Sequence, residues 1–254
     1  LVPCRGDAGA AKFAYRGRME LFSRAPMPSR FVCFGASGTS VHVTLDTRHQ
    51  AGPTIEFLGY VADVSDDQPA PVLDAPLWSF DDLLEMDDVG VLVSVFDPTG
   101  RRSVFERLDA AAIPIIGTRG LPHLSHPAAD LGEGSVVPSF TRIGHTTVLG
   151  RGVLAFADLV AHDTVVGDFT TLASHCIVLG HVIIGNGVAI GTGAIINNGT
   201  AARPIRIGDG AVVGSGAVVD RDVEAGGVVV GPRGMPMQEW AALRALASDR
   251  SSWR

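Results

Sequence analysis

The stretch Val160–Ile184 reads VAHDTVVGDFTTLASHCIVLGHVII, and an aliphatic residue returns in it at every sixth position. An α-helix repeats its apolar residues about every 3.6 positions and a strand every second position, so a period of six fits neither. It is typical of a parallel β-helix built from hexapeptide repeats, in which short strands alternate with tight corners. The stretch therefore predicts such a coil, with aliphatic residues repeating at Val160, Val166, Leu172, Val178 and Ile184.

The same pattern extends in both directions from this stretch. It begins at Leu131, and the step that starts at Leu149 has five residues instead of six, which predicts one tightened corner. Three hexads make one turn of the coil, so residues three hexads apart should stack in neighbouring turns. The polar segment Asn197–Pro204 interrupts the pattern and should loop out from a corner. After Ile207 the pattern resumes, and the apolar spacing in Met237–Ala247 predicts a short helix that caps the coil.

The residues before the repeats alternate between strand and helix patterns. Strands are predicted at Phe31–Phe34, Ile55–Asp63, Val89–Phe96 and Ile113–Ile116, and helices at Val41–His49, Trp78–Met86 and Arg101–Ala111. This order predicts a small α/β domain of the Rossmann-like βαβ type. A glycine-rich turn, Gly35-Ala36-Ser37-Gly38, joins its first strand to its first helix, where backbone N–H groups can face a phosphate. Asp63 ends the second strand, where a carboxylate can reach a ribose or a base edge.

The predicted fold class is thus an α/β Rossmann-like domain followed by an all-β coil of hexapeptide repeats and a short C-terminal helix. Residues 1–29 are predicted to be a flexible N-terminal extension, and Met27 would make a natural start before the first strand. The α/β domain is predicted to span residues 30–122 and the coil 123–234. Residues 235–254 then hold the C-terminal helix and tail.

Composition narrows the classes of partner and compartment. The chain has 254 residues and a net charge of −7, which argues against nucleic acid and anionic membrane partners. Its three cysteines, Cys4, Cys33 and Cys176, lack metal-ligand spacing and suggest reduced thiols in a cytoplasmic protein. No apolar run approaches the ~20 residues of a transmembrane helix. We therefore expect a cytoplasmic protein without a metal cofactor and without membrane or nucleic acid partners.

A βαβ domain with a GxxG turn, followed by this array, resembles the bacterial sugar acetyltransferases. That family includes UDP-amino-sugar N-acetyltransferases and sialic-acid O-acetyltransferases, and the resemblance covers about residues 30–234. Its specific motif is His-acid-x-x-hydrophobic-x-acid-Phe, present here as His162-Asp163-Thr-Val-Val-Gly-Asp168-Phe169. The resemblance implies a left-handed β-helix and a homotrimer. It also implies acetyl-CoA as co-substrate in the groove between neighbouring coils, and a nucleotide-linked amino sugar on residues 30–122.

The resemblance also implies roles for individual residues. His162 would be the catalytic base, Asp163 the acid that orients it, and Gly180 the residue whose backbone N–H meets the thioester carbonyl. The nucleotide would be held by Gly35, Ala36, Ser37, Gly38 and Asp63. CoA would be contacted by Thr171, Gly180, His181, Gly191, Ala194, Gly214 and Ala217. Thr171 stands where the family often has a second histidine, and the turn after Gly35 lacks the family's usual histidine and last glycine.

These residue types suit acyl transfer to an amine. The amine must lose a proton, and a histidine can accept it near neutral pH. The developing oxyanion needs a fixed donor, and a backbone N–H at a glycine lets a thioester come close. A carboxylate beside the base fixes its tautomer and stabilises the imidazolium.

Other functions remain open at the level of the sequence. A sugar O-acetyltransferase would use the same fold and the same base. A non-catalytic scaffold would have the same fold and bind a nucleotide sugar without catalysing a reaction. A zinc enzyme like the γ-type carbonic anhydrases would use three histidines, for which His162, His175 and His181 are candidates. Their spacing does not match the close histidine pair of that family, and no metal ligand is predicted. The histidines His123, His126 and His145 are interpreted as loop or solvent positions.

Overall fold

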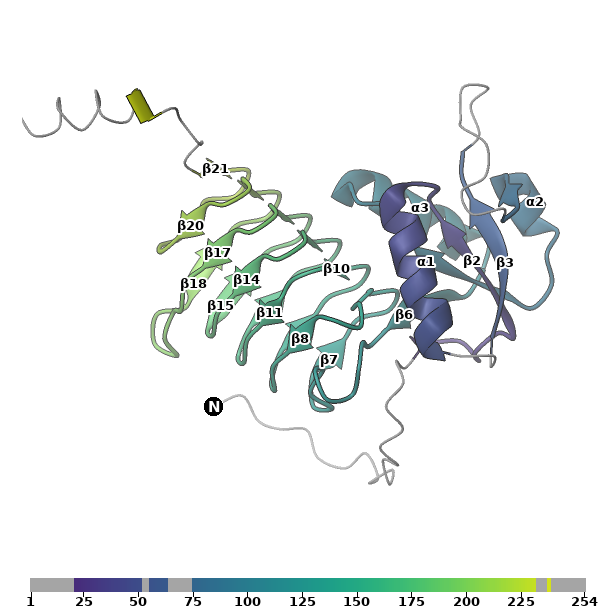
Figure 1. The fold of residues 1–254 in the computed structure, drawn as a ribbon, viewed down its shortest axis with the longest axis horizontal. Coiled ribbons are helices and arrows are strands. Elements are labelled where there is room, and N and C mark those ends of the chain that lie inside the picture. Colours follow the sequence, from purple (N-terminus) through teal and green to yellow (C-terminus); the bar gives the residue numbers. More distant parts are fainter. Residues whose placement is uncertain (1–20, 52–54, 64–74, 232–236, 239–254) are drawn as a thin grey trace, which may run out of the picture.

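The computed structural model describes residues 21–51, 55–63, 75–231 and 237–238 (Figure 1). It contains a six-stranded sheet with helices and, after it, three five-stranded sheets of very short strands. Most of the helix predicted at Met237–Ala247 lies outside the described residues. Among the described residues, no helix has the length and apolar character needed to cross a lipid bilayer.

The first unit is an α/β sheet in the order β1-β6-β5-β2-β3-β4. Its strands are β1 (Leu21–Phe22), β2 (Arg30–Phe34), β3 (Glu56–Val61), β4 (Leu77–Trp78), β5 (Val89–Val93) and β6 (Ile115–Thr118). Its helices are α1 (Gly38–Ala51), α2 (Phe80–Leu84) and α3 (Pro98–Ala110). All strands pair in parallel except β1. The four predicted strands and three predicted helices are all present, although Trp78 ends β4 and α2 starts only after Ser79, its N-cap.

One expectation for the N-terminal residues is wrong. Residues 1–29 were expected to be flexible, yet Leu21 and Phe22 form β1 and pair antiparallel with Thr118 and Gly117 of β6. Phe22 also packs against the core of the coil. A two-residue strand is too short to show an alternation of apolar and polar residues, so the sequence does not predict it. Residues 1–20 lie outside the described part of the chain.

The second unit is the predicted coil, and successive turns lie one above another in Figure 1. Its three parallel sheets have the orders β10-β13-β16-β19-β21, β20-β17-β14-β11-β8 and β18-β15-β12-β9-β7. The strands are β7 (Asp130–Leu131), β8 (Arg142–Ile143), β9 (Val148–Leu149), β10 (Leu154–Ala155), β11 (Leu159–Val160), β12 (Val165–Val166), β13 (Thr171–Leu172), β14 (Ile177–Val178), β15 (Val182–Ile184), β16 (Ala189–Ile190), β17 (Ile195–Ile196), β18 (Ile205–Ile207), β19 (Val212–Val213), β20 (Val218–Val219) and β21 (Val228–Val229). The aliphatic residues of the six-residue period fill its core, and the three-residue strands β15 and β18 each add a second core residue.

The shortened step of the array lies one corner later than predicted. Leu131 pairs with Leu149, three full hexads on, whereas Ala155 pairs with Leu172, one residue short of three hexads. The five-residue step therefore runs from Ala155 to Val160, not from Leu149. The reason is Leu154, which is buried against the α/β unit and not in the coil's core, where Ala155 takes the inward position. The predicted loop at Asn197–Pro204 is confirmed, because Ile195 pairs with Val218, five residues beyond three hexads.

A buried arginine of α3 joins the two units. Arg101 has 0% exposure and donates to the carbonyl oxygens of Gly152 at 2.7 Å and Phe169 at 2.6 Å, both in the coil. It also donates to the carbonyl oxygen of Val95, in its own unit, at 2.6 Å. Burial lowers the pKa of Arg101 to about 9, which leaves the side chain cationic at neutral pH. These hydrogen bonds replace the water that the buried cation has lost.

Candidate active site

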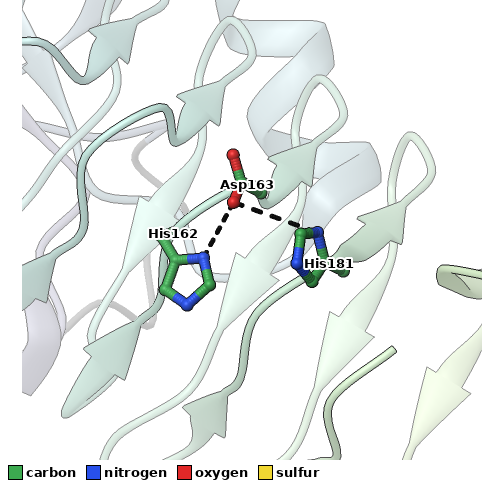
Figure 2. A group of neighbouring side chains, drawn as sticks. All are labelled: His162, Asp163 and His181. Carbon is green, nitrogen blue, oxygen red and sulfur yellow. Dashed lines mark hydrogen bonds and ion pairs between the residues drawn. The ribbon is translucent and has the colours of Figure 1, made fainter. Parts of the chain in front are cut away.

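His162 and Asp163 form a hydrogen-bonded pair on one corner of the coil. They lie between β11 and β12, where the chain turns from one sheet to the next. The Nδ1 atom of His162 is 2.8 Å from Oδ2 of Asp163 (Figure 2). Asp163 has a left-handed backbone with φ of 55°, a region that aspartate tolerates better than most residues. The side chains of His162 and Asp163 are 51% and 42% exposed, so the pair is accessible to a ligand.

Thr146, in the preceding turn, fixes the carboxylate of Asp163. Its Oγ1 donates to Oδ1 of Asp163 at 2.8 Å and accepts the backbone N–H of Asp163 at 3.0 Å. The hydrogen bonds from His162 and, to a smaller extent, Thr146 hold the pKa of Asp163 below its usual range. An ionised carboxylate keeps the proton of a neutral His162 on Nδ1 and leaves Nε2 as an acceptor. This is the geometry that the predicted orienting role of Asp163 requires.

Gly180 lies in the next turn at the position that His162 occupies in its own turn. A Cβ atom on Gly180 would lie 2.9 Å from Cε1 and 3.1 Å from Nε2 of His162, so the glycine makes room for the imidazole ring. The backbone N–H of Gly180 donates to Oδ1 of Asn198 at 2.8 Å. The predicted oxyanion donor therefore has a competing acceptor, which a thioester carbonyl must displace or share.

His181 lies on the other side of Asp163. Its Nδ1 is 3.9 Å from Oδ2 of Asp163, and its ring centroid is 5.5 Å from that of His162 at an interplanar angle of 86°. Figure 2 shows the two rings on opposite sides of the carboxylate. The two histidines thus flank one carboxylate oxygen, and His181, like Gly180, is a predicted CoA contact that lies beside the predicted base.

The same corner carries more functional candidates than the sequence suggested. The ring of His145 lies 5.5 Å from that of His162, and the ring of His126 lies 5.8 Å from that of His145. Thr146 and Asn198 were also missed. The signal that could have found His145 is the register of the hexads, which places it one turn before His162 once the shortened step is located correctly.

The other residues predicted to contact CoA lie apart from this corner. Thr171 is 1% exposed, and its hydroxyl accepts from Arg101 and donates to the carbonyl oxygen of Phe96, so its side chain is not available to a ligand. Ala194 and Ala217 point into the core of the coil and could meet a ligand only through their backbone. Gly191 and Gly214 are half-buried, and a Cβ on Gly191 would collide with the backbone N of Ser215 at 2.5 Å.

The predicted nucleotide turn lies between β2 and α1. Gly35 has φ of 116° and donates its N–H to the carbonyl oxygen of Val61, which makes the turn tight. The hydroxyl groups of Ser37 and Ser40 are 3.2 Å apart, and Ser40 Oγ also accepts from Ser94 at 2.8 Å. Ala36 and Gly38 complete the turn, and no atom lies within 4 Å of a Cβ built on Gly38.

Two further predicted residues lie near this turn. Asp63, which follows the end of β3, forms an ion pair with Arg107 of α3 at 2.8 Å. His175 lies on a different corner from His162, and its Nδ1 is 3.0 Å from Oδ1 of Asp158.

A cavity of about 430 Å³ opens between the two units, lined by Gly38, Thr39 and His42 of α1 and by Phe156, Ser174 and His175 of the coil. The three histidines of the zinc-enzyme alternative are therefore not together in this chain, since only His162 and His181 meet.

Comparisons with known proteins find similarity at the level of solved structures. No protein-family model matches the chain, and no curated protein matches it. The chain is 28% identical to WeeI from Acinetobacter baumannii over 79% of this chain and 96% of that one, with a TM-score of 0.66. It is 25% identical to the acetyltransferase domain of PglB from Neisseria gonorrhoeae in complex with acetyl coenzyme A, over 83% of this chain and all of that one, with a TM-score of 0.67.

PerB from Caulobacter crescentus, in complex with CoA and GDP-perosamine, has the same fold. It is 23% identical, with a TM-score of 0.66, over 79% of this chain and 93% of that one. These neighbours confirm the predicted resemblance to bacterial sugar acetyltransferases and the coil of hexapeptide repeats.

Proposed function

We propose that this protein transfers an acetyl group from acetyl-CoA to the amino group of a nucleotide-linked amino sugar, with His162 as the general base. The observation that carries the proposal is the pair of His162 and Asp163, held at 2.8 Å on an exposed corner with Gly180 beside the free edge of the ring. The acetyltransferase domain with bound acetyl coenzyme A, at 25% identity, supports acetyl-CoA as the donor. The sugar is the acceptor that the resemblance implies.

The reaction assigns one step to each residue of the corner. Nε2 of His162 accepts a proton from the attacking amine as the amine adds to the thioester carbonyl. Asp163 holds the Nδ1 proton and stabilises the imidazolium that forms. The N–H of Gly180 donates to the oxyanion, for which Asn198 must give up or share its hydrogen bond. Collapse of the tetrahedral intermediate releases the thiolate of CoA, which takes the proton back from His162.

The acceptor site belongs to the turn from Gly35 to Gly38 and the cavity beside it. This cavity lies at the corner of His175, whereas the proposed base lies on another corner of the coil. A sugar bound in the cavity would thus reach the base of a neighbouring copy more readily than its own.

This separation supports a homotrimer of left-handed coils as the active form. Exposed aliphatic side chains occur on all three sheets of the coil and offer apolar surface for such a contact: Val148 and Val165 on one, Val218 on the second, and Val212 and Val228 on the third. Residues 30–122 would be the nucleotide-sugar domain, of Rossmann-like type, and 123–234 the acyltransferase domain. Use of acetyl-CoA would suit a cytoplasmic location.

The test is a free-thiol release assay with acetyl-CoA and a panel of UDP-, GDP- and dTDP-linked amino sugars. Turnover is expected with at least one acceptor, and His162→Ala should lower kcat by about 10²–10⁴-fold. His123→Ala, which removes an exposed histidine elsewhere, is the matched control and should retain activity. Absence of turnover with every acceptor, or full activity of His162→Ala, would refute the proposal. Light scattering of the same samples reports the oligomeric state, and a monomeric active protein would refute the trimer.

A further inference from the structure

Three groups that ligate metals converge at the corner of His162. Nδ1 of His162 and Nδ1 of His181 lie 2.8 and 3.9 Å from the same oxygen, Oδ2 of Asp163 (Figure 2). Ligand atoms of the three residues all lie within 4.8 Å of one another. Zinc–ligand distances of about 2.0–2.2 Å in a tetrahedron place ligand atoms about 3.3 Å apart. The observed distances lie on either side of that value, so small side-chain rotations would complete the geometry.

The chemistry of this donor set matches a borderline divalent ion. Two neutral imidazoles and one carboxylate are ligands that zinc prefers, and a set of three leaves the fourth tetrahedral position open. Thr146 holds Oδ1 of Asp163 at 2.8 Å, which leaves Oδ2 directed at the two rings. Such a bond from outside the ligand set orients a carboxylate ligand. His181 is 30% exposed and the other two side chains more so, and an ion can therefore enter from solvent.

A second histidine distinguishes this corner from the neighbouring one. His175 and Asp158 form a similar exposed pair at 3.0 Å, and among the described residues no third metal-ligating group joins them. Within the described part of the chain, the corner of His162 is the one place where three such ligand atoms come together. His175 therefore provides a matched control for the contribution of a single histidine–aspartate pair.

We infer that His162, Asp163 and His181 form a binding site for Zn²⁺ or a similar divalent transition-metal ion, and that the bound ion switches off the catalytic base. A neutral imidazole has one proton on its two nitrogens. When Nδ1 of His162 binds the ion, that proton moves to Nε2, which becomes a donor and no longer accepts a proton from the amine. The ion thus inhibits by changing which nitrogen of the base carries the proton. Metal binding itself is independent of the proposed function, whereas the inhibition rests on it.

The binding test uses isothermal titration of the chelator-treated full chain with zinc, without substrates. We expect one ion per chain. His181→Ala should weaken binding by about 100-fold or more, since loss of a residue that only orients a ligand already costs about 10–100-fold. His181→Gln should weaken it similarly, and His175→Ala should bind zinc as the unmodified protein does. Circular dichroism checks that each variant is folded. Absence of zinc binding, or equal binding by His181→Ala and the unmodified protein, would overturn the site.

The switch is tested in the thiol release assay under the same conditions. Saturating zinc should lower kcat at least ~10-fold, and added chelator should restore kcat. Full turnover at saturating zinc, or turnover that requires zinc, would overturn the switch. If no acceptor turns over in the absence of zinc, the proposed function fails, while the titration still decides the metal site.

Discussion

The hydroxyl group of Thr146 holds the carboxylate of Asp163 from the preceding turn of the coil. Thr146 Oγ1 donates to Oδ1 at 2.8 Å and accepts the N–H of Asp163 at 3.0 Å. Both residues have left-handed backbones, with φ of 59° and 55°. This conformation is unusual for a β-branched residue such as threonine, and the stacked corners on either side hold it in place. The orientation of His162 therefore depends on a residue that does not touch it.

Replacing Thr146 should lower the rate of chemistry more than substrate binding. Thr146→Val keeps the shape and removes both hydrogen bonds to Asp163, so kcat should fall on the order of 10-fold, less than the ~100-fold that a 1 Å misplacement can cost. The KM for acetyl-CoA should stay within about 2-fold, because positioning of the base acts on the transition state. Thr146→Ser keeps the hydroxyl and should restore most of kcat. Equal losses in the valine and serine variants would indicate that the hydroxyl has no positioning role.

A side chain at Gly180 should displace the imidazole of His162. In Gly180→Ala the new Cβ would meet Cε1 and Nε2 of His162 at 2.9 and 3.1 Å, and the exposed ring can swing away. Thermal stability should change little, while kcat should fall by about 100-fold. Steady-state kinetics and a melting curve on the same sample check both parts. Unchanged kcat would show that the present position of the ring is not the productive one.

Asn198 competes with the proposed oxyanion for the N–H of Gly180. Asn198→Ala removes the acceptor that now lies 2.8 Å from this nitrogen and leaves the donor to the thioester. We expect kcat to be retained or raised, because a donor that need not exchange partners is better preorganised. The variant is measured beside the unmodified protein at saturating acetyl-CoA. A fall of 10-fold or more would mean that Asn198 itself contributes to the reaction.

The sequence predicts features that repeat along the chain, such as the inward residues of the coil, better than contacts between residues stacked in neighbouring turns. Each inward residue of the coil repeats after six positions, so the period alone located the core. The sequence places Leu154 in the core of the coil because it is aliphatic, but its side chain packs against the α/β unit outside the coil. Asp168 belongs to the motif that carries the resemblance, yet its Oδ1 accepts the N–H of Arg151 in the preceding turn and so supports the corner.

The residues around the candidate site meet across turns whose lengths differ. Thr146 reaches Asp163 over the shortened step, and Asn198 reaches Gly180 at the start of the inserted loop. The contact of Thr146 could be anticipated only once the shortened step was located. Asn198 lies three full hexads after Gly180, and there the aliphatic period does not show that the polar side chain accepts the N–H of Gly180.

Thr171 should prove to be structural. Its hydroxyl joins Arg101 and the carbonyl oxygen of Phe96 at 2.9 and 2.8 Å, between the two units. Thr171→Val removes both bonds from a buried site and should destabilise the fold by about 1–3 kcal/mol. The KM for acetyl-CoA should be unchanged, which contrasts with the CoA contact that the resemblance implies for Thr171. A raised KM without loss of stability would instead place Thr171 at the CoA site.

Arg101 should contribute far more to stability than its neighbour Arg102. Its guanidinium donates to the carbonyl oxygens of Gly152, Phe169 and Val95, and Arg101→Met would leave these buried acceptors without a donor. Because each such loss costs about 1–3 kcal/mol, we expect destabilisation of at least about 3 kcal/mol. Arg102 is exposed and lies over the ring of Phe169 at 5.1 Å, an arrangement that contributes about 1 kcal/mol or less.

Urea unfolding of Arg101→Met and Arg102→Met compares two adjacent positions of α3 with the same substitution. A buried cation can also be costly, and its replacement by an apolar side chain sometimes stabilises a protein. Here the acceptors are backbone carbonyls, which remain when the arginine is removed and then lack the hydrogen bonds that it donates. Destabilisation should therefore prevail. Equal unfolding midpoints for the two variants would show that water replaces the guanidinium between the units, and that Arg101 does not hold them together.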